Sequence, residues 1–178
     1  TNISLGCRDL GDQVQVSNYR SQNFKIKLYP NFAPIGTGMV ITKSAFTTYL
    51  KEVEGSQIRL ALGRKGNTLT SGEDNDIILT IIKNGFEIAY VPSLVISHLI
   101  PASRYTTSYL EKMAFEVSRS WVKVLNIHKI CPWKPIPSYT LVLRNIKAYL
   151  RFRAWSSPLN YIKWRAACGK FKGQSEIA

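Results

Sequence analysis

The fold of this chain is decided by the stretch Ser71-Gly72-Glu73-Asp74-Asn75-Asp76-Ile77-Ile78-Leu79. Three acids lie together here, although the whole chain has only 11 acids against 24 Lys and Arg. Ser71 can cap a helix, the acids then fall in its first turn, and Gly85 suits the left-handed residue after its end. The helix dipole stabilises each acid in the first turn by ~0.3–1 kcal/mol. This effect is sufficient reason for one acid at a helix start. Three acids behind a flexible Ser-Gly turn also suggest a functional acid site.

The composition is that of a globular protein. The chain has 178 residues, of which 45% are hydrophobic and 20% charged, enough for one domain with a core. No apolar run approaches the ~20 residues that a membrane helix needs. Cys7, Cys131 and Cys168 are widely spaced and form no CxxC pair, which favours a reduced cytoplasmic setting. The chain begins with Thr1 rather than Met, so we expect a fragment of a longer protein.

The net charge of +13 is placed unevenly along the chain. Residues 1–103 carry ten Lys and Arg against eight acids, a net charge of +2. Residues 104–178 carry fourteen against three, a net charge of +11. A field of this kind favours an anionic partner, which could be a phosphate group, a lipid surface or nucleic acid.

Hydrophobic periodicity and capping signals predict a mixture of strands and helices. The expected strands cover residues 13–16, 24–29, 86–91 and 94–98. Helices are expected at residues 43–53, 71–83, 108–125 and 138–155, and in a last segment that opens at Ser157-Pro158 and ends before Gly169. Ser108-Tyr109-Leu110-Glu111 has the pattern of a capping box for the third of these helices.

Several other residues could carry chemistry. His98 follows an apolar segment and precedes a loop, so it could ligate a metal, and Arg104 could clamp a phosphate. His128 is expected to have an ordinary structural role. Gly36-Thr37-Gly38 is either a tight turn or a loop where backbone approaches a ligand. Asp74-Asn75-Asp76 is a literal DxD, but it opens a helix rather than following a strand, which argues against a metal–diphosphate role.

The motifs taken in order resemble the acceptor-side half of a family 2 glycosyltransferase, an inverting enzyme of the GT-A fold. The resemblance covers about residues 34–125. It depends on Gly36-Thr37-Gly38-Met39-Val40-Ile41, Gly63-Arg64, Gly72-Glu73-Asp74-Asn75-Asp76-Ile77, Asn84-Gly85-Phe86-Glu87-Ile88-Ala89-Tyr90-Val91-Pro92, His98-Leu99-Ile100-Pro101 and Arg104.

The resemblance implies an α/β fold, an incomplete GT-A-like mixed sheet with flanking helices and a C-terminal helical extension. Residues 1–105 would be the acceptor-side part of the catalytic domain, and residues 106–178 a basic helical region packed on it. Cut from its other half, the sheet would keep an unpaired edge, which a second chain could cover to form a dimer.

The family's roles transfer residue by residue. Asp74 matches the general base, and Glu73 and Asp76 would help it to hold the acceptor. Gly36, Thr37, Gly38, Arg64 and Arg104 would lie at the donor. His98 matches a histidine that completes the shell of a divalent metal, Mn²⁺ or Mg²⁺, in several relatives.

The resemblance therefore predicts transfer of a sugar, with inversion, from a nucleotide-sugar donor to a hydroxyl of a glycan or a lipid-linked acceptor. The family's nucleotide-binding half, with its strand-terminal DxD, is expected upstream of Thr1. On that expectation the chain alone would be inactive and would bind no metal by itself.

The alternative is a basic binding module for nucleic acid or an anionic membrane surface, without catalysis. Nucleic acid is not expected as a partner, because the tryptophans fall mostly at helical core spacing and no nucleic-acid motif occurs. Arg144, Lys147 and Arg151 would share one helix face. We expect a cytoplasmic protein whose basic tail rests on the anionic inner leaflet of a membrane.

Overall fold

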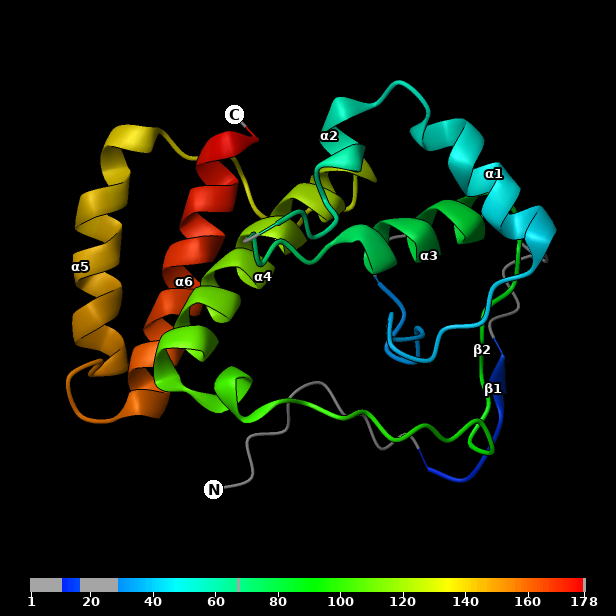
Figure 1. The fold of residues 1–178 in the computed structure, drawn as a ribbon. Coiled ribbons are helices and arrows are strands. Elements are labelled where there is room, and N and C mark those ends of the chain that lie inside the picture. Colours follow the sequence, from blue (N-terminus) through cyan, green and yellow to red (C-terminus); the bar gives the residue numbers. More distant parts are fainter. Residues whose placement is uncertain (1–10, 17–28, 67, 178) are drawn as a thin grey trace. The chain divides into compact units, whose positions relative to one another are not determined.

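A computed structural model describes residues 11–16, 29–66 and 68–177 (Figure 1). It is a mixed α/β structure in which helices predominate and the sheet has two strands. The chain divides into two compact units. The first unit takes the described residues up to Gly55 together with Ile77–His98, and the second takes Ser56–Asp76 together with the described residues from Leu99 onward.

The first unit contains a small sheet, one complete helix and most of a second. Strand β1 (Gln15–Val16) pairs antiparallel with β2 (Ala89–Tyr90), with Gln15 opposite Tyr90. Helix α1 covers Lys43–Val53, and α3 covers Glu73–Lys83. The division between the units falls inside α3, after Asp76.

The core of the first unit is built on the apolar run of α3. Its buried members are Ala33, Ala45, Tyr49, Val53, Ile77, Ile78, Ile81, Ile82 and Ile88. The four isoleucines of α3 recur at helical spacing and lie in one cluster with three residues of α1. Burying a side chain of this size contributes ~1.5–3 kcal/mol, so this run is what gives the unit its stability.

In this unit, the observed helix boundaries agree closely with those predicted from the sequence. The helix expected at residues 43–53 is confirmed as α1, and Gly85 has the positive φ of 80° expected after α3. Because α3 begins at Glu73, Gly72 holds the cap position that was expected for Ser71.

The strand predictions were less successful. The strand expected at 86–91 is shorter, and residues 94–98 form no strand in the part of the chain that the structure describes. The apolar side chains Leu94, Val95 and Ile96 are exposed, and no described strand pairs with this segment. The strand expected at 24–29 lies almost wholly outside the described residues.

The second unit is helical. It contains α2 (Gln57–Leu60), η2 (Ala102–Tyr105), α4 (Thr107–Ile127), η3 (Ser138–Thr140), α5 (Leu141–Phe152) and α6 (Pro158–Glu176). Helix α6 packs against both α4 and α5 (Figure 1). The expectation of three C-terminal helices is confirmed, although Ser56–Asp76 also belongs to this unit, so the units differ from the 1–105 and 106–178 division.

The helix starts of this unit are set by side-chain caps. The hydroxyl of Ser157 accepts a hydrogen bond from the Asn160 amide at 3.2 Å, and Pro158 follows at the first position, as predicted. Helix α4 is capped by Thr106, whose hydroxyl accepts from the Tyr109 amide, rather than by Ser108. The cap therefore lies two residues before the predicted capping box.

Gly169 corrects the predicted end of the last helix. Helix α6 continues to Glu176, and Gly169 is buried in its interior. A Cβ atom on Gly169 would lie 2.0 Å from the Phe115 carbonyl oxygen, and one on Gly173 would lie 2.8 Å from that of Arg119. Both contacts move four residues toward the C-terminus, from Phe115 to Arg119 on α4 and from Gly169 to Gly173 on α6, so the two helices run parallel. Glycine is needed here for close helix approach, which sequence alone does not separate from a helix stop.

Candidate active site at the start of helix α3

The first turn of α3 places three carboxylates, Glu73, Asp74 and Asp76, in different environments. Glu73 is exposed, Asp74 is half-buried and Asp76 is completely buried. The Asn75 amide donates to Asp74 Oδ1 at 2.9 Å, which fixes one oxygen of the Asp74 carboxylate against the first turn of the helix. The environment, rather than the residue type, distinguishes the three acids chemically.

Asp76 is held by two basic side chains from distant parts of the second unit. Arg59 Nε donates to Asp76 Oδ2 at 2.9 Å, and His128 Nε2 lies 2.7 Å from Oδ1. The side chains of Arg59, His128 and Asp76 are 10%, 6% and 0% exposed. Charges this deeply buried are tolerated only when they are paired and hydrogen-bonded.

This geometry revises the role expected for Asp76. Because both its oxygens are engaged and its side chain has no accessible surface, we assign it a structural role in place of the predicted acceptor contact. His128 has the ordinary structural role that the sequence favoured. Arg59 was not anticipated, because it lies 17 residues from Asp76 in sequence and no local pattern links the two.

Glu73 lies against the backbone of the preceding loop. A Cβ atom on Gly63 would lie 2.6 Å from Glu73 Oε2, so a larger residue at this position would displace the Glu73 carboxylate. The Gly72 amide donates to the Leu62 carbonyl at 3.2 Å and holds the same loop to the start of α3. Arg64 is exposed and follows Gly63 in this loop.

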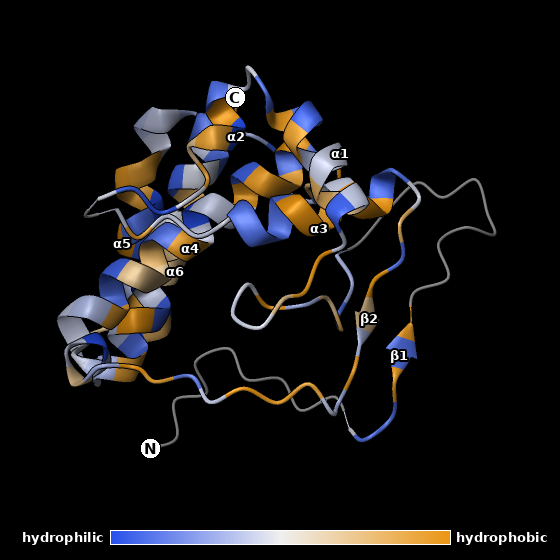
Figure 2. Ribbon diagram, turned by 45° about the vertical axis from the view of Figure 1, so that its right-hand side comes forward, coloured by the Kyte–Doolittle hydropathy of each residue, from blue (hydrophilic) through white to orange (hydrophobic). Residues whose placement is uncertain are grey.

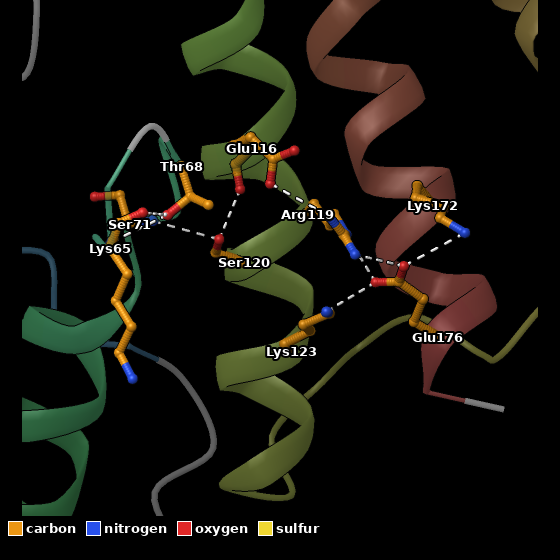
Figure 3. A network of polar contacts seen from close by, with 9 residues as sticks. All are labelled: Lys65, Thr68, Ser71, Glu116, Arg119, Ser120, Lys123, Lys172 and Glu176. Atoms are coloured by element: carbon orange, nitrogen blue, oxygen red, sulfur yellow. Dashed lines mark hydrogen bonds and ion pairs between the residues drawn. The ribbon is translucent and has the colours of Figure 1, made fainter. Parts of the chain in front are cut away.

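A buried serine of α4 braces the segment that leads into α3 (Figure 3). Ser120 Oγ donates to the Glu116 carbonyl at 2.7 Å and accepts from the Ser71 amide at 3.4 Å. Ser120 is 1% exposed, so this contact is shielded from water. Loop, helix start and α4 together fix the backbone on which Asp74 is presented.

The remaining predicted site residues lie on the surface of their units. Gly36, Thr37, Gly38 and His98 belong to the first unit, and Arg104 lies in η2 of the second. All five residues are exposed. Gly38 has a φ of 88°, and a Cβ atom added there would lie 3.0 Å from the Ile96 side chain, which supports a tight turn. The acids, Gly63 and Arg64 all belong to the second unit.

A divalent metal site needs several donor side chains close together. Within residues 11–16, 29–66 and 68–177, no three His, Cys, Asp or Glu side chains lie close enough to hold a metal ion together. His98 alone does not fit Mn²⁺ or Mg²⁺, each of which prefers several oxygen ligands.

The fold and the site together define a mixed α/β protein in which one helix begins with three acids and a second unit is helical and basic. None of the helices in the described residues has the length and hydropathy needed to cross a bilayer. No family model, curated protein or solved structure matches the chain. The function of the chain is therefore inferred from its residues and their geometry.

Proposed function

We propose that this chain is the acceptor-side part of an inverting glycosyltransferase of GT-A type, with Asp74 as the general base. The donor is a nucleotide sugar, and the acceptor is a hydroxyl of a glycan or a lipid-linked saccharide. The contrast between Asp74 and Asp76 carries the proposal. One acid is buried and neutralised by Arg59 and His128, while the other is half-buried at a braced helix start.

The reaction requires one ionised carboxylate in the right place. Asp74 takes the proton of the acceptor hydroxyl as its oxygen attacks the anomeric carbon. The bond from that carbon to the diphosphate breaks, and the nucleoside diphosphate leaves from the opposite face, which inverts the configuration. Glu73 helps to hold the acceptor, while Arg64 and Arg104 offset the charge that grows on the departing diphosphate.

The role of Asp74 is tested by Asp74→Asn in the complete gene product, with transfer measured over a panel of nucleotide sugars. This change keeps the shape of the side chain and removes proton acceptance. We expect transfer to fall ~10²–10⁴-fold, with donor affinity little changed. Asp12→Asn, at an exposed acid outside the site, is the matched control.

The two variants distinguish loss of the general base from a general effect of charge. Turnover near that of the unchanged protein in Asp74→Asn would make Asp74 a helix-stabilising acid and would place the base elsewhere. A similar loss in Asp12→Asn would indicate a general effect of charge.

The proposal includes a divalent metal, to which His98 would contribute one ligand among several. In the complete enzyme, we expect His98→Ala to raise the Mn²⁺ or Mg²⁺ concentration needed for half-maximal transfer. His98 is exposed, so the substitution is expected to leave folding unchanged. A metal titration identical to that of the unchanged enzyme would return His98 to a surface role.

The proposal also covers assembly and location. Strands β1 and β2 form a two-stranded sheet, and a small sheet can be extended by a strand from a second chain. A sheet-edge dimer is therefore proposed, with sedimentation velocity as its test. A lipid-linked acceptor would be met at the cytoplasmic face of a membrane, so we propose a cytoplasmic, peripheral enzyme.

A further inference from the structure

A pocket in the second unit lies beside α5 and α6, away from the acids of α3. Its volume is about 660 Å³, within the ~300–1,000 Å³ range of small-ligand sites. Its walls combine aliphatic and aromatic side chains with long basic ones. Nothing in the glycosyltransferase proposal uses this pocket.

The pocket is strongly basic. Five cations line it, Arg144, Lys147 and Arg151 from α5 and Lys163 and Lys170 from α6. The lining residues that the structure describes include no Asp or Glu. Lys170 Nζ lies 3.9 Å from the centre of the Trp133 ring, a cation–π contact that holds this ammonium in place. A phosphate group is the anion that such a cluster of Lys and Arg complements.

Helix α5 also carries an apolar stripe of exposed residues; Figure 2 colours the ribbon by the hydropathy of each residue. The residues Leu143, Ile146 and Leu150 are 72%, 53% and 59% exposed. They are three and four positions apart, so they share one face, to which Tyr139 and Val142 add further exposed apolar surface.

The opposite side of α5 is the one that packs in the unit. Ala148 is buried, and Trp164 Nε1 of α6 donates to the Asn145 carbonyl at 2.9 Å. The three cations of α5 lie between the packed side and the apolar stripe. This order is the one found in helices that lie in the plane of a membrane interface.

The charge pattern selects among possible occupants. A second copy meeting the stripe would bring the two sets of α5 cations close together, and like charges repel. Nucleic acid would complement the cations but would leave the leucines and the isoleucine of the stripe in contact with water. An anionic phospholipid surface complements both features, since it presents phosphate groups beside an apolar interior.

We infer that the second unit docks on an anionic phospholipid surface, with a lipid phosphate in the basic pocket and the α5 stripe in the acyl region. The inference deepens the peripheral location in the proposed function, but it does not rest on the catalytic role, because none of its residues belongs to α3. Its failure would leave the role of Asp74 untouched.

The test is co-sedimentation of the 178-residue chain with vesicles. One set contains phosphatidylcholine alone, and the other contains phosphatidylcholine with phosphatidylglycerol, both at low salt. We expect binding to the anionic vesicles at least tenfold tighter than to the neutral ones. Added salt should weaken the anionic binding, because surface charges are screened.

Three variants separate the contributions of the pocket and the stripe. The triple variant Arg144→Gln, Lys147→Gln, Arg151→Gln should weaken binding by about fivefold per cation, about a hundredfold in all. Its control is Lys43→Gln, Lys51→Gln, Lys83→Gln, which removes the same charge from exposed helix positions of the first unit and should change affinity less than twofold. Leu143→Ser, Ile146→Ser, Leu150→Ser should weaken binding at least tenfold while keeping all the cations.

Four outcomes would overturn the inference. Two concern the vesicles and the charge variants: equal binding to both vesicle types, and equal losses of affinity in the two charge variants. Two concern the stripe variant: unchanged binding to vesicles, and dissociation of a dimer that the unchanged chain forms. The last would make the stripe an interface between two copies. Since all nine substituted residues are exposed, each variant should keep its helical circular dichroism.

Discussion

At the scale of single residues, Asp74 and Asp76 show how two identical side chains acquire different roles. Asp76 is buried and bonded to Arg59 and His128, so its charge is compensated inside the unit. Asp74 is half-buried and bonded to its neighbour's amide at the helix start. A shift of two positions on the helix separates a structural acid from a candidate base.

Replacing Asp76 should therefore cost much more stability than replacing Asp74. Asp76→Ala leaves Arg59 buried without its carboxylate, and removing one partner of a buried pair typically costs ~3–5 kcal/mol. Asp74→Asn keeps the shape of the side chain and removes its charge from the helix dipole, which costs ~0.3–1 kcal/mol. The measurement is the free energy of unfolding in urea for both variants. Equal losses would mean that the Asp76 contacts contribute little.

At the scale of secondary structure, the approach of α6 to α4 decides how the helical unit packs. Gly169 and Gly173 are one turn apart on α6 and meet the backbone of α4 at Phe115 and Arg119. Glycine in a helix interior costs ~1 kcal/mol relative to alanine in propensity alone. The close contact between helices offsets that cost.

The substitutions Gly169→Ala and Gly173→Ala should destabilise the protein, although alanine is the better helix former. The added methyl at Gly169 would lie 2.0 Å from a backbone oxygen, which cannot move aside as a side chain can. Overpacking of this kind costs ~1–3 kcal/mol, and Gly169→Ala should cost more than Gly173→Ala. Thermal unfolding followed by circular dichroism measures both. A higher melting temperature for Gly169→Ala would mean that the helices lie further apart.

At the scale of the whole molecule, the chain carries a net charge of +13, of which +11 lies in residues 104–178. Glu176 is the acid that gathers cations in that region (Figure 3). Its carboxylate binds Arg119 at 2.7 Å, Lys123 at 2.9 Å and Lys172 at 3.4 Å. Two of these cations lie on α4, so the carboxylate joins the end of α6 to that helix.

These contacts predict how stability changes in acid. Burial alone would raise the pKa of Glu176, but hydrogen bonds from Arg119 and Lys123 outweigh it and lower the pKa to about 2. A carboxyl whose pKa is lower in the folded state stabilises the fold above its unfolded pKa, ~4.3 for Glu, and loses that contribution as the pH falls. The loss should run from about pH 4.5 down to about pH 2.

Urea unfolding across this pH range measures the effect. Glu176→Gln should be less stable at pH 7 and should show a smaller decline in acid. Glu54→Gln, at an exposed acid of the first unit, is the control and should keep the full decline. If Glu176→Gln declined as steeply as the unchanged chain, other carboxyls would be responsible.

The sequence by itself determined the features that depend on residues within one or two turns of each other. The limits of α1, the acid-headed helix α3 with Gly85 after it, and the Ser157-Pro158 start of α6 were all predictable. Caps, helix dipoles and hydrophobic periodicity act over about four residues, so their signals are present in the chain itself.

Only the tertiary structure decided the features that join distant segments. Asp76 meets Arg59 and His128 across 17 and 52 residues, and Gly169 is needed because Phe115 of another helix lies against it. The basic pocket likewise requires α5 and α6 to lie side by side. Local patterns do not encode such contacts, because burial and close approach depend on which surfaces meet after the chain has folded.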